Sequence, residues 1–231
     1  MKKIKVSSEL VYLLAIVLMA LSVAMISCTN YGLSMIVAPA YLLSVKLGVL
    51  SFGQCEYIVQ GALFVVFCIL MKRIKPAYLF SFVTGLIYGA VLDFWRLVIP
   101  HFNPDITAPG SLPVWLNIIY FITGMCMTSF SVALFFRTYI YPQVYDFFVK
   151  GISERYHINQ TKFKIGFDAA CLAVSAAMSL ILFGGFVGIG FGTVIMALFN
   201  GALIGAFGKL IDRCFVTEPS FKKFSRLFEL C

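Results

Sequence analysis

The sequence predicts an all-α, polytopic membrane protein with six transmembrane helices. Of its 231 residues, 61% are hydrophobic and only 12% are charged, which is too little polar surface to cover a water-soluble globule. Sixteen of the eighteen Lys and Arg residues stand in four clusters that long apolar stretches separate. The clusters are Lys2, Lys3 and Lys5; Lys72, Arg73 and Lys75; Arg137, Lys150, Arg155, Lys162 and Lys164; and Lys209, Arg213, Lys222, Lys223 and Arg226.

The spacing of these clusters predicts the topology. Basic residues that flank membrane helices collect on the cytoplasmic side, so all four clusters are expected there. An even number of crossings must then join neighbouring clusters, and two crossings in each interval give six helices with both termini in the cytoplasm. The sequence therefore predicts a multi-pass protein of a cytoplasmic membrane, with the lipid bilayer as its main partner.

In the first half of the chain, helices are expected over 9–28, 54–71 and 76–99. The first stretch also has the basic start of a signal peptide, but its apolar run is long enough to span the bilayer, and we expect it to be retained. The stretch 32–50 is apolar but contains Pro39, Lys46 and Gly48. A full span there would place the Lys72 cluster outside, so we expect a re-entrant or broken segment on the outer side, with a spanning helix as the alternative.

In the second half, helices are expected over 114–136, 166–183 and 186–211. The preceding loop 100–113 contains Asn, Pro and Gly but no Lys or Arg, which is typical of an outer loop. The charged and amphipathic stretch 137–164 is expected at the cytoplasmic interface. The basic tail 213–231 is expected in the cytoplasm, and its amphipathic part after Pro219 is expected to be a surface anchor.

The two halves have a similar order of elements, which suggests an internal repeat. An offset of 112 residues aligns Glu56 with Asp168 and Ser81 with Thr193. Within a single membrane domain, 1–231, we expect repeat 1 at about 9–100 and repeat 2 at about 113–212. Each repeat contains a helix, a broken segment and two more helices. Three crossings per repeat would invert the second unit, as in many secondary transporters.

Several of these residues also match a known pattern. The stretch 31–46, Ser51-Phe-Gly-Gln54, Gln60, Gly89-x-x-x-Asp93 and Gly188-x-Gly-x-Gly-Thr193 resemble the YczE/YyaS/YitT family of bacterial integral membrane proteins. The resemblance covers nearly the whole chain and implies a bacterial cytoplasmic (inner) membrane location and a shared fold. The family is largely uncharacterised, so the resemblance implies no catalytic residue.

Ionisable groups within the predicted helices are the first candidates for function, because each costs about 2.5–3.5 kcal/mol to insert near the bilayer centre. Asp93 and Arg96 stand three residues apart on one helix face, as a structural ion pair or as part of an outer gate. Glu56 and Asp168 stand near the starts of their helices. They are either helix caps or, if they face the interior, sites for coupling protons or cations.

Polar residues in the broken segments and near the helix breaks are the candidates for contacting a solute. We expect these contacts from Ser34, Tyr41, Gln60, Thr193 and Asn200. Packing between helices is the alternative for Asn200, which lies beside a ridge of small residues four apart.

Several function classes are not expected. The two His residues stand alone and the seven Cys residues form no C-x-x-C pair, so we expect no metal site and no cofactor. The chain offers no convincing pair of nucleophile and base, so we do not expect an enzyme. Its basic residues flank apolar segments and form no patch with interleaved aromatics, so no nucleic-acid partner is expected.

These features favour a transporter of an unidentified small polar solute that works by alternating access between two inverted units. The alternative is a non-transporting membrane subunit, either a substrate-capturing or a regulatory component of a larger assembly. The absence of a nucleotide-binding loop is compatible with that alternative. A partner subunit or a homo-oligomer is then an expected partner.

Overall fold

The computed structural model describes residues 4–72 and 75–228. Within this part of the chain, six helices are long and apolar enough to cross a membrane, which confirms the predicted class of helical multi-pass membrane protein. They are α1 (Ser8–Thr29), α3 (Phe52–Met71), α4 (Leu79–Val98, preceded by the 3₁₀ turn Pro76–Tyr78), α5 (Val114–Phe135), α7 (Gln160–Phe183) and α8 (Phe191–Cys214).

The remaining elements are short. Helix α2 (Ala38–Leu47) lies between α1 and α3, and α6 (Val144–Arg155) lies between α5 and α7. The chain ends carry strands β1 (Ile4–Ser7) and β2 (Phe215–Glu218), helix α9 (Lys222–Ser225) and the 3₁₀ turn Arg226–Phe228; another 3₁₀ turn, Pro100–Phe102, follows α4. The described chain thus has the order long helix, short helix, long helix, long helix twice over, as the sequence predicts.

The stretch after α1 is a broken segment and not a spanning helix. Asn30 takes a left-handed conformation after α1, and α2 begins only at Ala38, with Pro39 in its first turn. Gly48, with a φ of 66°, then ends α2. Ten residues of helix reach only about 15 Å, half of the hydrocarbon core of a bilayer.

Two helix starts differ from the prediction by five residues or more. Helix α7 begins at Gln160, where Oδ1 of Asn159 accepts a hydrogen bond from the backbone nitrogen of Lys162 and caps the helix. Helix α8 begins at Phe191, five residues later than expected, because Gly188 has a φ of 68° and Gly190 is extended. The glycine-rich stretch instead forms backbone hydrogen bonds with the segment after α1: Leu33 donates to Gly188, and Gly192 donates to Tyr31.

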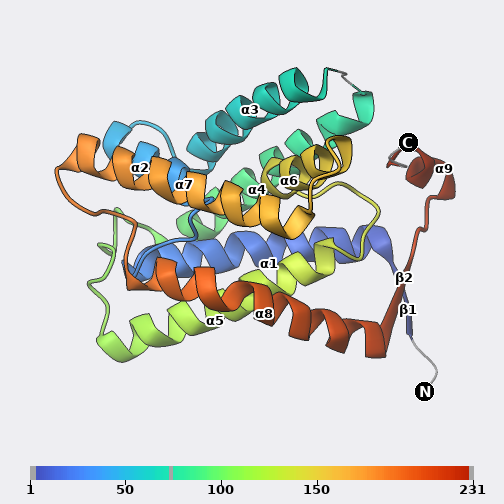
Figure 1. The fold of residues 1–231 in the computed structure, drawn as a ribbon. Helices are drawn as coiled ribbons and strands as arrows, with labels where there is room; N and C mark the ends of the chain where they lie inside the picture. Colours follow the sequence, from blue (N-terminus) through green and yellow to red (C-terminus); the bar gives the residue numbers. More distant parts are fainter. Residues whose placement is uncertain (1–3, 73–74, 229–231) are drawn as a thin grey trace.

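Helix α1 is the most buried of the six spans and packs against α4 and α5 (Figure 1). Its small residues Ala15, Ala20 and Ala24 are fully buried, which lets the neighbouring backbones approach closely. By contrast, α7 and α8 present large apolar side chains outward, such as Ile181 and Leu198. Such exposed apolar surface fits contact with lipid.

The two chain ends meet at one end of the bundle (Figure 1). Strand β1 pairs in parallel with β2, with Ile4 opposite Phe215 and Ser7 opposite Glu218. The sequence did not predict these strands. The aromatic residues of the tail also differ from the expected surface anchor, because Phe224 and Phe228 pack against Phe80 of α4.

Candidate functional site

A polar cluster lies inside the protein where α3, α4 and α6 meet. We call it the Glu56 cluster, and it consists of Glu56 and Gln60 on α3, Tyr88 on α4 and Tyr145 on α6. Glu56 and Gln60 have no exposed surface, and the two tyrosines are buried. Because residues four apart stack on one helix face, α3 presents both of its polar groups in the same direction.

The hydrogen bonds of this cluster meet on a single carboxylate oxygen. Nε2 of Gln60 and the hydroxyl group of Tyr145 both donate to Oε2 of Glu56, each over 3.0 Å. Oε1 of Glu56, Oε1 of Gln60 and the hydroxyl oxygen of Tyr88 have no hydrogen-bond partner among the described residues. Buried polar atoms are nearly always paired in proteins, so this concentration of unpaired oxygens marks a place where a proton, an ion or a solute can bind.

Helix capping, the alternative role for Glu56 and Asp168, belongs to other residues. Oγ of Ser51 accepts from the backbone nitrogen of Gln54, whose side chain accepts in return from the backbone nitrogen of Ser51. This capping box starts α3 one turn before Glu56. Asn159 caps α7, and Asp168 follows two turns later.

Short helix α6 carries Tyr145 into the cluster. It packs against α3, α4 and α7, so it is held from three sides. On its face toward α3, the ring of Phe147 lies 4.8 Å from the ring of Phe67, and Gly151 leaves room for that same ring. These apolar contacts fix the position from which the Tyr145 hydroxyl reaches Glu56.

Asp93 and Arg96 do not form a direct ion pair among the described contacts. The carboxylate of Asp93 instead accepts a short hydrogen bond from Oγ of Ser51 and one of 2.8 Å from the backbone nitrogen of Gly53. Asp93 therefore ties α4 to the start of α3. The guanidinium carbon of Arg96 lies 5.3 Å from the ring centre of Phe52, in a cation–π contact.

Tyr41 lies at the same end of α3 as this contact. Its ring packs edge-on against Phe52 at 5.4 Å, and a side chain at Gly188 would collide with it. Ser34 precedes α2, where its carbonyl oxygen accepts hydrogen bonds from the backbone nitrogens of Val37 and Ala38. Tyr41 and Ser34 therefore both lie in the broken segment 32–50, and their contact with a solute stays a prediction.

The candidates on α8 make contacts within the bundle. Oγ1 of Thr193 accepts from the backbone nitrogen of Gly190 over 3.3 Å, which helps to start α8. Oδ1 of Asn200 accepts from Oγ of Ser129 over 2.6 Å and ties α8 to α5. Both contacts fit a packing role in this conformation.

Asp168 takes part in a separate charged cluster between α6 and α7. The ammonium group of Lys164 lies 3.5 Å from the carboxylate of Asp168 and 3.8 Å from that of Asp146. One cation thus bridges two carboxylates from neighbouring helices.

Among the predicted residues, the structure brings Glu56 and Gln60 together and places the others elsewhere. Sequence reasoning missed Tyr88 and Tyr145, which complete the cluster. The available signal for Tyr145 was its position in the stretch 142–150, which resembles the stretch 39–46 that contains Tyr41. Lys164 was assigned only to a basic cluster.

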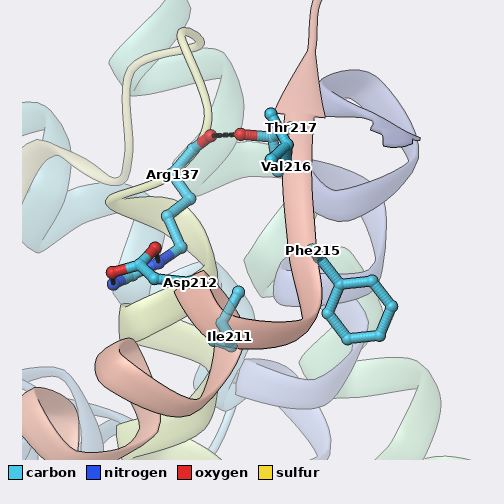
Figure 2. A pocket seen from close by; sticks show the side chains of 6 residues that line it. All are labelled: Arg137, Ile211, Asp212, Phe215, Val216 and Thr217. Carbon is cyan, nitrogen blue, oxygen red and sulfur yellow. Dashed lines mark hydrogen bonds and ion pairs between the residues drawn. The ribbon is translucent and has the colours of Figure 1, made fainter. Parts of the chain in front are cut away.

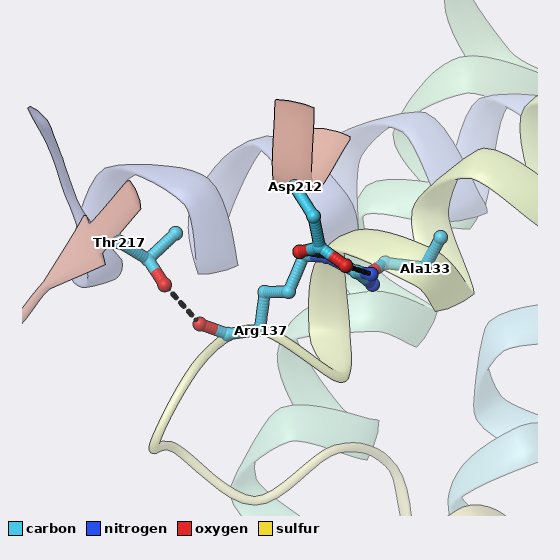
Figure 3. Close-up of polar contacts among 4 residues, drawn as sticks. All are labelled: Ala133, Arg137, Asp212 and Thr217. Atoms are coloured by element: carbon cyan, nitrogen blue, oxygen red, sulfur yellow. Dashed lines mark hydrogen bonds and ion pairs between the residues drawn. The ribbon is translucent and has the colours of Figure 1, made fainter. Parts of the chain in front are cut away.

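Two hollows lie near the chain ends. The larger, of about 670 Å³, has Tyr139, Tyr141, Asp146, Lys150, Lys164 and Phe228 among its lining residues. The smaller, of about 230 Å³, lies where α8 passes into β2, and Figure 2 shows its six lining residues. Arg137 makes several of the contacts around this hollow (Figure 3). Its guanidinium group donates to both carboxylate oxygens of Asp212 and to the carbonyl oxygen of Ala133. Its own carbonyl oxygen accepts a hydrogen bond from the hydroxyl group of Thr217. These contacts join α5 to α8 and β2, so this hollow has a structural role.

Comparison with known proteins shows the family to which the chain belongs. A family model described as a family of unknown function (DUF6198) matches residues 6–209. No curated protein and no solved structure was found to match the chain.

Proposed function

We propose that this chain, which belongs to the DUF6198 family of unknown function, is a membrane transporter that moves a small polar solute by alternating access. The observation that carries the proposal is the Glu56 cluster. A fully buried carboxylate on a membrane helix is expensive, so its presence calls for a function. Its hydrogen bond to Tyr145 also joins the first half of the chain to the second.

The arrangement of the short helices supports the same proposal. Helix α2 packs against α3 and α7, and α6 packs against the same two helices. In Figure 1, α1 and α5 lie side by side and run in opposite directions, while α2 and α6 lie toward opposite ends of the bundle. We infer that the two halves, about 9–100 and 113–212, form inverted repeats that rock around the cluster.

Within this proposal, the residues have different roles. Gln60, Tyr88 and Tyr145 contact the solute or the coupling ion bound at Glu56. Asp93 and Arg96 on α4 and Tyr41 on α2 lie near the start of α3. They form a gate at one end of the path that the solute takes through the protein. Thr193 and Asn200 become available to the solute only when α8 moves relative to Gly190 and Ser129, their partners in this conformation.

The proposed location follows from the basic residues. Both chain ends lie at the same end of the bundle, and the clusters at 137–164 and 209–226 belong to that end. The positive-inside rule assigns it to the cytoplasm. The resemblance to bacterial membrane proteins makes the bacterial cytoplasmic membrane our proposal for the location.

Exchange in vesicles tests the proposal. Purified protein is reconstituted alone into vesicles loaded with unlabelled amino acids, sugars and organic acids, and an isotope-labelled pool of the same compounds is added outside. We expect labelled compounds of one class to enter vesicles with the wild-type protein and not vesicles with Glu56→Ala. A compound that binds the wild-type protein but never enters favours the alternative, a substrate-capturing subunit.

A further inference from the structure

We propose that Glu56 is the coupling site, that the coupling ion is a proton, and that a single proton is bound per protein because Lys164 neutralises the corresponding site in the second half. This inference rests on the proposed transport function and names its energy source. It is carried by the unequal environments of two aligned carboxylates, Glu56 and Asp168, which lie 112 residues apart.

The carboxylate of Glu56 has no partner of opposite charge among the described residues, since no Lys, Arg or His residue there forms an ion pair with it. The titratable groups on which the charge of Glu56 acts are Cys55 on its own helix, Tyr88 on α4 and Tyr145 on α6, all neutral when protonated. Of the charged groups on α4, Asp93 also acts on Tyr88 and is another anion, and Arg96 lies over the ring of Phe52.

The charged groups of the other neighbouring elements are engaged elsewhere or exposed, and on α6 the exposed ones are Lys150, Glu154 and Arg155. Helix α2 also packs against α3, but the ammonium group of its Lys46 donates to the carbonyl oxygen of Leu182 on α7. On α6, Asp146 faces Lys164. A fully buried carboxylate with no cation beside it needs a positive charge from outside the protein.

A proton fits the Glu56 cluster better than a metal ion does. Metal ions such as Ca²⁺ and Mg²⁺ take about six or more oxygen ligands. The Glu56 cluster offers three unpaired oxygens, and no group of three or more His, Cys, Asp or Glu side chains in residues 4–72 and 75–228 is placed to hold a metal ion. A proton needs only one of these oxygens. Oε1 of Glu56 is the free position for it, because Oε2 already accepts two hydrogen bonds.

Asp168 needs no proton, because a cation of the protein already lies beside it. Asp168, the counterpart of Glu56, lies beside the ammonium group of Lys164, which also approaches Asp146. Lys164 thus acts as a cation that is permanently attached to the second half. The aligned position in the first half, 112 residues earlier, is Phe52, which carries no charge.

Proton binding at Oε1 would change the contact between the halves. An ionised carboxylate accepts a stronger hydrogen bond than a neutral carboxyl group, so the bond from Tyr145 weakens when Glu56 is protonated. Helix α6 is then held less firmly against α3. The proton enters from water at one side of the membrane and leaves to water at the other, and no covalent bond other than O–H forms or breaks.

Infrared spectroscopy of the purified full-length protein in lipid vesicles, without any solute, tests the inference. The C=O stretching band of a protonated carboxyl group is followed while the pH is changed. We expect one buried carboxyl group to gain and lose its band in the wild-type protein, Glu56→Gln to lack it, and Asp168→Asn to keep it. Tyr145→Phe should retain the band at a shifted frequency, because one hydrogen bond to the carboxyl group is removed.

A second variant keeps the test decisive if Glu56→Gln does not fold. Glu56→Asp keeps a carboxyl group, so its titrating band should persist at a different frequency even if Glu56→Gln fails to fold. A wild-type band that also titrates in Glu56→Gln, or a Glu56 band that stays constant over the whole pH range of the folded protein, overturns the proposal. So does a band whose titration moves when sodium replaces choline in the buffer, since a metal ion then competes for the site.

Proton binding at Glu56 and solute transport can fail independently of each other. A titrating Glu56 band in a protein that exchanges no solute leaves proton binding standing and removes transport. Solute exchange in a protein whose Glu56 never titrates leaves transport standing and removes the proton as its coupling ion.

Discussion

The hydroxyl group of Tyr145 on α6 donates a hydrogen bond of 3.0 Å to Oε2 of Glu56 on α3, 89 residues earlier in the chain. Both side chains are buried, and the contact joins a short helix of the second half to a spanning helix of the first. The stability and the activity of the protein should therefore respond to small changes at this contact.

Tyr145→Phe removes the hydroxyl group and leaves the shape of the ring. We expect the free energy of unfolding to fall by about 1–3 kcal/mol, as for a hydrogen bond to a charged group, and solute exchange to slow. Unfolding in mixed detergent micelles measures the first effect. Tyr156→Phe is the matched control, because its hydroxyl donates to the carbonyl oxygen of Leu70 from an exposed position. Equal losses in the two variants would contradict a special role for Tyr145.

Gly53→Ala tests the close approach of α3 and α4. A Cβ atom at Gly53 would collide with the backbone carbonyl oxygen of Gly89 and with the carboxylate of Asp93. We expect a loss of about 1–3 kcal/mol and a lower thermal midpoint, as for overpacking. Gly61→Ala on the same helix is the control, because its nearest neighbour is the Phe82 ring at 3.5 Å. That variant should be neutral or more stable, since Ala favours helix.

Lys164→Met should leave two carboxylates, Asp146 and Asp168, facing each other without a cation. We expect about 1–2 kcal/mol of destabilisation, because Lys164 is partly exposed and water screens the repulsion. Adding Asp168→Asn to Lys164→Met should recover much of the loss. Lys162→Met, at an exposed position of the same helix, should change little. Additive effects of Lys164→Met and Asp168→Asn would show that the two residues do not interact.

Glu9→Ala should release the C-terminal tail. The carboxylate of Glu9 accepts hydrogen bonds from the hydroxyl group of Tyr139 and from the backbone nitrogens of Ser220 and Phe221. We expect limited proteolysis to cut the tail after β2 several times faster in this variant. In Glu218→Ala the rate should stay near that of the wild type, because only an exposed ion pair to Lys5 is lost. Unchanged cleavage in Glu9→Ala would mean that Glu9 does not hold the tail.

The sequence predicted the long helices because twenty or so apolar residues between basic clusters allow few alternatives. It also predicted the broken segment, where Pro39 and Gly48 limit α2. The direct ion pair between Asp93 and Arg96, one of the interpretations considered for them, is not formed. Their spacing gives proximity along one helix, while the partners of Asp93 come from the start of α3.

Contacts between distant segments were beyond sequence reasoning. Tyr145 stands in an amphipathic stretch that resembles an interfacial helix, and nothing local indicates that its hydroxyl group reaches Glu56. The pairing of β1 with β2 was missed for the same reason. Each strand has only four residues, and their register depends on where α1 and α8 place the two ends of the chain.

Cysteine accessibility from each side of the membrane tests most directly whether the two short helices face opposite sides across Glu56. Single cysteines replace Val49 after α2 and Glu154 in α6, both exposed, in a variant without native cysteines. We predict that an impermeant thiol reagent labels Val49→Cys only from outside and Glu154→Cys only from inside. A third variant, Lys222→Cys, should also be labelled only from inside. Labelling of Val49→Cys and Glu154→Cys from the same side would contradict the inverted arrangement and remove the basis for alternating access.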